Sequence, residues 1–145
     1  MKVIVYIEND NACVMSIAPG IDMSIEDIAA RDVPEGCEWV VVDTKSLPSN
    51  KLQETWAIVD GTVVVDSAKM NAHLIAQAEN KKAELLALFW SSTANWRLDM
   101  QLDDISDKDK ENLKSWILWR KNVETVDTSS ASEKNPAIFP EAPAD

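Results

Sequence analysis

His73, the only histidine of the chain, is the first residue to examine for chemistry, because an imidazole is the commonest general base. It lies in a stretch of strong helix formers. Asp66 and Gln77 are the polar residues that could lie near it, but nothing completes a triad of nucleophile, base and orienting group. We therefore expect His73 to be a partly exposed structural residue, and we expect the chain not to be an enzyme.

The two cysteines, Cys13 and Cys37, belong to no CxxC motif. A structural zinc site needs about four nitrogen or sulfur ligands, which one histidine and two cysteines do not supply. A catalytic thiolate needs an electropositive environment, whereas both cysteines lie in apolar surroundings. A disulfide requires their Cα atoms to approach within about 7 Å, which the sequence leaves open. We expect both thiols to be reduced, and we expect no metal and no cofactor.

An acidic cluster is the remaining candidate for metal binding. A calcium-binding loop places acids at alternate positions around a central glycine and ends on a glutamate at position twelve. The cluster here has no glycine and a different spacing, so we expect its carboxylates to be solvated groups near helix ends. Its members are Asp99, Asp103, Asp104, Asp107 and Asp109.

Composition and charge exclude several classes of partner. The 145 residues carry a formal net charge of −11, which argues against nonspecific binding to nucleic acid or to an anionic membrane. With three glycines, the chain contains none of the glycine-rich phosphate-binding motifs. No apolar run approaches the roughly 20 residues of a membrane span, and the first ten residues do not have the pattern of a secretory leader. We expect a cytosolic protein.

The first 66 residues read as a small antiparallel β-region with one short helix. Apolar runs at 2–7 and 12–17 flank a turn cluster and predict a hairpin. A capping pattern opens a short helix at Ser24, and residues 38–43 predict a strand. The pair Asp60-Gly61 between two apolar runs predicts a second hairpin, since this dipeptide suits a type I′ turn.

The remainder predicts a helical hairpin over 67–127 and an extended tail over 128–145. From Ser67 to about residue 102 there is no proline or glycine, and the hydroxyl side chains at 91–93 favour a kink there. A second helix begins after Ser106, a good N-cap. Three prolines then punctuate the tail, at 136, 140 and 143. The predicted fold class is α+β.

Six tryptophans are the main candidates for core and contact positions. We expect Trp39 and Trp56 to fill the core of the β-region. Trp96, Trp116 and Trp119 fit the seam between the two helices better than a partner surface, although both remain open. The apolar pair Ile138-Phe139 lies in a proline-rich extended segment, so it must dock on its own domain or on another chain.

The C-terminal half resembles the bacteriophage tail fibre assembly protein family, the tail fibre chaperones of the Caudovirales. The resemblance covers about residues 85–143 and rests on Leu113-x-x-Trp116-x-x-Trp119-Arg120, on Val126-Asp127-Thr128-Ser129 and on Ile138-Phe139-Pro140-x-x-Pro143. The family closes on a motif with tryptophan where this chain has Phe139.

The resemblance implies a chaperone without catalytic activity that binds the distal, C-terminal part of a tail fibre and assists its folding or trimerisation. It further implies the host cytoplasm as the site of action, with retention in the virion and an oligomer on the trimeric fibre left open. From the acidic charge we expect no nucleic-acid and no membrane partner. We expect the fibre contacts at Trp116, Trp119, Arg120, Ile138, Phe139 and Pro140.

Two other functions are weighed against this one. A structural component of the virion, such as a minor tail or fibre-tip protein, would be present in purified particles. A small hydrolase or nuclease would need a pocket that brings His73 beside two carboxylates.

Overall fold

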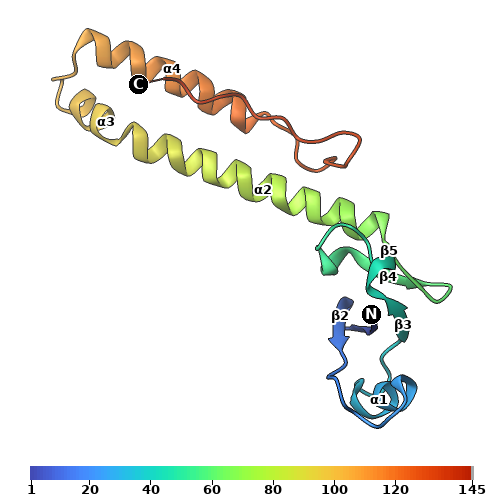
Figure 1. The fold of residues 1–145 in the computed structure, drawn as a ribbon. Helices are drawn as coiled ribbons and strands as arrows, with labels where there is room; N and C mark the ends of the chain where they lie inside the picture. Colours follow the sequence, from blue (N-terminus) through green and yellow to red (C-terminus); the bar gives the residue numbers. More distant parts are fainter. Residues whose placement is uncertain (145) are drawn as a thin grey trace. The chain divides into compact units, whose positions relative to one another are not determined.

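The computed structural model describes residues 1–144 and has antiparallel strands followed by helices, which confirms the α+β class (Figure 1). The chain forms two compact units, Met1–Met70 and a second unit from Asn71 onward. The predicted boundaries at 66/67 and 127/128 stay predictions. Asp145, the last residue of the predicted tail, lies outside the described residues.

A three-stranded antiparallel sheet forms the centre of the first unit. Its strands β1 (Lys2–Glu8), β2 (Asn11–Ser16) and β3 (Trp39–Asp43) lie in the order β2-β1-β3. Because successive side chains of a strand point to opposite faces, β1 serves two cores. Val3 and Val5 belong to one of them and Ile4 to the other.

The helix α1 (Ile25–Asp32) covers the Ile4 face of this sheet. It begins where the sequence predicts, since the Ser24 hydroxyl accepts a hydrogen bond from the backbone N–H of Asp27 at 3.1 Å. Its apolar residues Ile28 and Ala29 are buried against Ile4.

A separate two-stranded sheet, β4 (Trp56–Val59) and β5 (Thr62–Val65), confirms the second predicted hairpin. Asp60 and Gly61 have positive φ angles of 51° and 76°, as a type I′ turn requires. Trp56 and Val63 from this hairpin enter the same core as Val3 and Val5. The sequence predicted these strands, but not their division into two sheets.

The expectation for Trp56 is confirmed and the expectation for Trp39 is wrong. Trp56 is buried, and its indole N–H donates to Asn50 Oδ1 at 2.7 Å. Trp39 is 38% exposed. It is the first residue of β3, and Val41, two residues on and therefore on the same face, takes the place against the α1 core.

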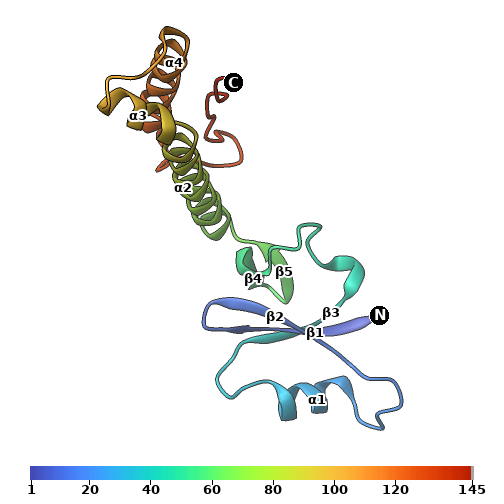
Figure 2. The same ribbon diagram turned by 90° about the vertical axis from the view of Figure 1, so that its left-hand side faces the viewer.

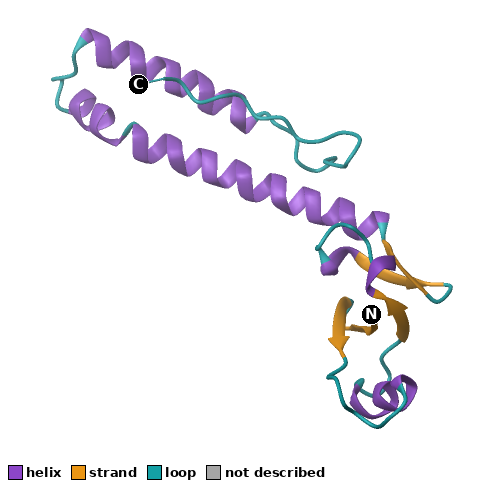
Figure 3. Cartoon of the chain, in the orientation of Figure 1, coloured by secondary structure: helices purple, strands orange, loops and turns teal. Residues whose placement is uncertain are grey.

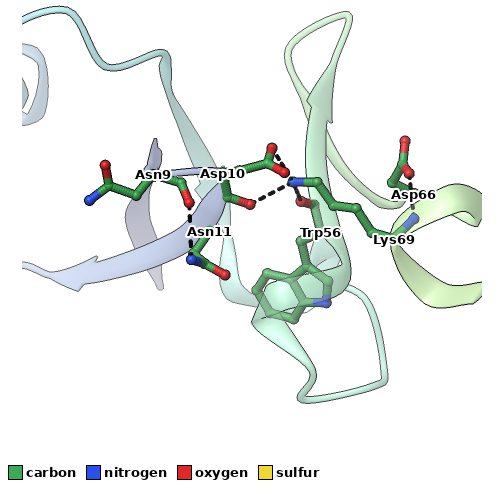
Figure 4. Close-up of polar contacts among 6 residues, drawn as sticks. All are labelled: Asn9, Asp10, Asn11, Trp56, Asp66 and Lys69. Atoms are coloured by element: carbon green, nitrogen blue, oxygen red, sulfur yellow. Dashed lines mark hydrogen bonds and ion pairs between the residues drawn. The ribbon is translucent and has the colours of Figure 1, made fainter. Parts of the chain in front are cut away.

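Lys69, in the first turn of α2 (Ser67–Ser92), connects this helix to both sheets of the first unit (Figure 4). Its Nζ donates to the backbone oxygens of Asp10 at 2.8 Å and of Trp56 at 3.1 Å. It also lies 3.1 Å from the Asp10 carboxylate. Asp66 caps the helix by accepting a hydrogen bond from the Lys69 backbone N–H.

The predicted kink is confirmed as a break at Thr93, which separates α2 from α3 (Ala94–Gln101) (Figure 3). The Thr93 hydroxyl donates to the Phe89 carbonyl at 2.7 Å, four residues earlier. Such back-bonding competes with the regular helical ladder. Thr93 is fully buried, so the core holds this break in place.

The helix α4 (Asp107–Glu124) runs back along α3 and the end of α2, which confirms the helical hairpin (Figures 1 and 2). Ser106 caps it by accepting a hydrogen bond from the backbone N–H of Asp109 at 3.1 Å. No helix within residues 1–144 combines the length and the apolar character that crossing a membrane requires.

Candidate partner-binding site

Two tryptophans of α4 form the centre of the second unit. Trp116 and Trp119 are three residues apart, share one helix face and are each 4% exposed. Their rings meet edge to face with centroids 5.3 Å apart. Phe89 of α2 and Val123 of α4 complete this buried cluster. The seam predicted for Trp116 and Trp119 is therefore confirmed, and Trp96 packs against it partly buried.

The tail docks on its own helical hairpin through two neighbouring residues. Phe139 packs against the cluster of Phe89, Trp116, Trp119 and Val123. The indole N–H of Trp119 donates to the Pro140 carbonyl at 3.0 Å. Of the two docking alternatives left open by the sequence, the structure shows the intramolecular one.

Ile138 is the exposed residue of the docked segment. Its side chain is 79% exposed, whereas Phe139, the next residue, is half-buried. Because Phe139 and Pro140, the two residues that follow it, are both anchored on the helical hairpin, the exposed isoleucine is held close to a defined place on the surface. Such a fixed apolar side chain is what a partner contact requires.

Arg120 lies over aromatic rings and does not point into solvent. Its guanidinium carbon is 4.9 Å from the ring centre of Phe89 and 5.6 Å from that of Trp90, distances at which cation–π attraction operates. Its Nε lies 3.6 Å from a Glu124 carboxylate oxygen. Among the described residues, this buried Nε has no hydrogen-bond partner.

Trp90, which is 49% exposed, also has Arg97 over its ring at 4.7 Å. Arg97 is fixed there by hydrogen bonds from its Nε to the Thr93 hydroxyl and from its Nη2 to the Trp90 carbonyl. The result is a half-exposed indole flanked by two guanidinium groups on a strongly acidic chain.

The turn after α4 is ordered by Lys82 and Asp127. Lys82 Nζ donates to the carbonyls of Glu124 and Val126, each at 2.9 Å. One Asp127 carboxylate oxygen accepts hydrogen bonds from the backbone N–H and the hydroxyl of Ser129. These bonds from Ser129, with smaller contributions from Ser130 and Lys82, hold the pKa of Asp127 below its ordinary value.

A groove of about 300 Å³ runs between α2 and the docked tail. Its lining is mostly apolar, with polar groups from Gln77, Lys81 and Ser132. The apolar part comes from both walls and comprises Leu74, Ala78, Ala131, Pro136, Ala137 and Phe139. A groove of this character accepts apolar side chains of a partner.

His73 lines a second hollow on the surface of α2, with Gln77, Lys81 and Glu84 among its neighbours. Glu84 is the one carboxylate among the described residues that line it. Within residues 1–144, no group of three or more histidine, cysteine, aspartate or glutamate side chains is arranged to hold a metal ion. Cys13 and Cys37 are both free thiols and are half-buried.

Five of the six predicted contact residues belong to one assembly. Trp116, Trp119, Phe139 and Pro140 form the docking site of the tail, and Ile138 is displayed by it. Arg120 lies instead over Phe89, a member of the same cluster, and over Trp90. Their contact with a partner stays a prediction. The burial of Trp116 and Trp119 means that, in this conformation, they position the tail and offer little surface of their own.

Sequence reasoning missed the α2 wall of the groove, the anchoring lysine Lys82 and the cluster around Trp90. The signal for the groove lay in the tail, whose apolar pair had to dock somewhere. Nothing in the sequence around Lys82 distinguishes it from the other lysines of α2.

Comparison with known proteins gives a family and close relatives. The family model described as "Caudovirales tail fibre assembly protein, lambda gpK" matches residues 20–144. Tail fiber assembly protein U' of Escherichia phage Mu is 34% identical over 127 residues, which are 86% of this chain and 68% of that protein. Tail fiber assembly protein U' of Escherichia phage P1 shows the same identity and coverage. No solved structure matches the chain.

Proposed function

The chain belongs to the Caudovirales tail fibre assembly protein family, and from this membership we propose that it is a chaperone for the assembly of a phage tail fibre. The observation that carries the proposal is the match of the family model to residues 20–144. The resemblance of the C-terminal motifs, from Leu113 to Pro143, supports the same function.

The partner in this proposal is the distal, C-terminal part of the tail fibre. The subunits of a trimer expose, before they associate, the apolar surface and strand edges that the finished trimer buries. A protein that covers such surfaces favours the assembly-competent state by mass action and lowers the rate of aggregation. No step of this activity breaks or forms a covalent bond, so it needs neither a catalytic group nor a cofactor.

The docked tail supports a contact face at Ile138. Trp119 and Phe139 fix the segment, and Ile138 projects from it with a 79% exposed side chain. Complete burial of one isoleucine contributes about 1.5–3 kcal/mol. A single residue of this kind therefore accounts for an affinity change of about tenfold or more.

The test is co-expression with the fibre protein encoded by the same phage, followed by affinity capture of this chain. We expect the fibre to become soluble and trimeric only in the presence of this chain, and to be captured with it. A fibre that trimerises alone and is not captured would contradict the proposal.

The contact face is tested in the same experiment by Ile138→Ser. We expect a loss of fibre capture of about tenfold, because the variant removes apolar contact area. Leu118→Ser is the matched control, since Leu118 is an aliphatic residue of α4 that is 62% exposed. Equal capture of the fibre by Ile138→Ser and Leu118→Ser would mean that Ile138 is not a contact residue.

The captured complex and the purified particles together show whether this chain stays on the fibre after assembly or leaves it. Assembly takes place in the host cytoplasm in this proposal. Co-elution after a salt wash, together with presence in purified particles, would identify the chain as a lasting subunit of the fibre. Absence from particles would identify it as a chaperone that leaves after assembly.

A further inference from the structure

We propose that the outer edge of the docked tail, at Ala137 and Phe139, pairs with an extended strand of the fibre, which lies in the groove along α2. This inference deepens the proposed function and rests on it. It assigns the type of contact, backbone pairing at a strand edge, which is a recurrent mode of peptide recognition.

The backbone groups at this edge are unused. Among residues 1–144, neither the N–H nor the carbonyl of Ala137 or Phe139 takes part in a hydrogen bond. Backbone donors and acceptors are strong groups that are nearly always paired when they are buried. A partner that covered this segment would have to supply their partners, and an extended strand supplies both kinds in the right alternation.

The alternation of residues along the extended tail indicates that this edge faces away from α4. In extended backbone, the side chains of consecutive residues point to opposite faces. The N–H and the C=O of one residue point to the same edge, and those of the next residue point to the other edge. Phe139 packs inward and Ile138 outward, as this alternation requires. The Pro140 carbonyl is bonded to Trp119 of α4, so the edge of residues 138 and 140 faces α4. The edge of Ala137 and Phe139 then faces away from α4.

Proline placement agrees with this division. Proline has no N–H and is excluded from positions where a paired strand needs a donor. Pro140 lies on the edge that faces α4, and Pro136 is an even number of residues before it along the chain. Ala137 and Phe139, on the other edge, keep their donors.

The space for the partner strand lies on the same side. The groove of about 300 Å³ is bounded by Ala137 and Phe139 on one wall and by Leu74 and Ala78 of α2 on the other. A strand paired with the tail would run in this groove and place alternate side chains on its apolar lining.

Charge indicates what else the partner strand carries. Lys81 is the one charged residue among the described residues that line the groove, on a chain whose net charge is −11. A strand with apolar residues and one carboxylate within reach of Lys81 is complementary to this lining, and a strand with a lysine at that place is not.

The test uses proline to delete single donors. Ala137→Pro removes an N–H from the outer edge, and Ala142→Pro removes one from the edge that faces α4. Ala137→Val adds comparable bulk at the groove and keeps the N–H. In the co-expression capture, we expect Ala137→Pro to weaken fibre binding about fivefold relative to Ala137→Val, as the loss of one hydrogen bond predicts. We expect Ala142→Pro to bind like the unsubstituted chain.

Amide hydrogen exchange gives a second readout on the unsubstituted chain. We expect the N–H of Phe139 to exchange rapidly in the free chain and slowly in the complex. Equal binding by Ala137→Pro and Ala137→Val, or unchanged exchange at Phe139, would overturn the strand-pairing inference while wild-type capture still supports the chaperone. If the unsubstituted chain captures no fibre, both fail.

Discussion

At the scale of single residues, the two tryptophans of α4 differ in one hydrogen bond. Both are 4% exposed, but the indole N–H of Trp119 is bonded to Pro140, whereas that of Trp116 is buried and has no partner among residues 1–144. A satisfied buried donor stabilises the fold modestly, and an unsatisfied one costs free energy. The tail therefore packs on both indoles but is hydrogen-bonded by Trp119 alone among the two.

This difference predicts unequal effects of two matched substitutions. Trp119→Phe and Trp116→Phe remove the same ring volume from the same cluster. We expect Trp119→Phe to lower the free energy of unfolding by about 1 kcal/mol more than Trp116→Phe, because it alone breaks a hydrogen bond. Urea unfolding followed by circular dichroism measures both. Equal losses would mean that the bond to Pro140 contributes nothing.

Asp127 predicts a local dependence on pH. Its pKa is lowered chiefly by the hydroxyl and the backbone N–H of Ser129. A carboxyl whose folded pKa is depressed contributes stability above its unfolded pKa, near the ordinary 3.8, and loses that contribution as the pH falls through the folded pKa. The turn after α4 should therefore keep this support at neutral pH and lose it only in acid below about pH 4.

The carboxyl carbon of Asp127, followed by NMR titration, checks this directly. We expect its midpoint to lie below that of an ordinary aspartate and to rise in Ser129→Ala. Ser130→Ala should raise it less, because Ser130 makes the smaller contribution. An unchanged midpoint in Ser129→Ala would show that groups other than Ser129 lower the pKa of Asp127.

At the scale of elements, Lys69 connects the start of α2 to two separate sheets. Its ammonium group donates to the carbonyl of Asp10, in the turn between β1 and β2, and to the carbonyl of Trp56, the first residue of β4 (Figure 4). The carboxylate of Asp10 is 86% exposed, so its ion pair with Lys69 contributes little. The two carbonyl bonds are the important part of this contact.

We predict that Lys69→Met lowers the free energy of unfolding of the first unit by about 2 kcal/mol, because hydrogen bonds from a charged group are worth about 1.5–3 kcal/mol. Asp10→Asn keeps both carbonyls and should cost less than about 0.5 kcal/mol. Amide hydrogen exchange at the β1 residues Val3 and Val5, measured in increasing urea, follows this unit. A larger loss in Asp10→Asn than in Lys69→Met would reverse the assignment.

The sequence predicted the elements well where the local signal is strong. Ser24 and Ser106 cap helices as expected, Asp60-Gly61 forms the hairpin turn, and Thr93 marks the break in the long helix. Each of these depends on hydrogen bonds or φ angles within a few residues, which is why a single sequence reveals them.

Long-range placement was not predictable in the same way. Trp39 looked like a core residue, but its place at the start of β3 leaves it exposed. The bond from Trp119 to Pro140 joins residues 21 positions apart, and the groove joins α2 to the tail across more than 50 positions. Burial at such sites is decided by packing between elements, which composition and periodicity do not specify.

At the scale of the whole molecule, each unit contains its own buried clusters. The first unit has one cluster around Val3, Val5 and Trp56 and one around Ile4 and α1, and the second unit has the cluster of Phe89, Trp116 and Trp119 between two helices. Partner contacts proposed for the tail therefore belong entirely to the second unit.

The division into two units predicts a calorimetric result. We expect units that share no buried cluster to absorb heat in separate steps, in which case the calorimetric enthalpy exceeds the van't Hoff enthalpy obtained for a single step. Lys69→Met should move one step and Trp119→Phe the other. Saturating fibre protein should raise only the step that Trp119→Phe lowers, so heat capacity alone would reveal which half of the chain holds the fibre.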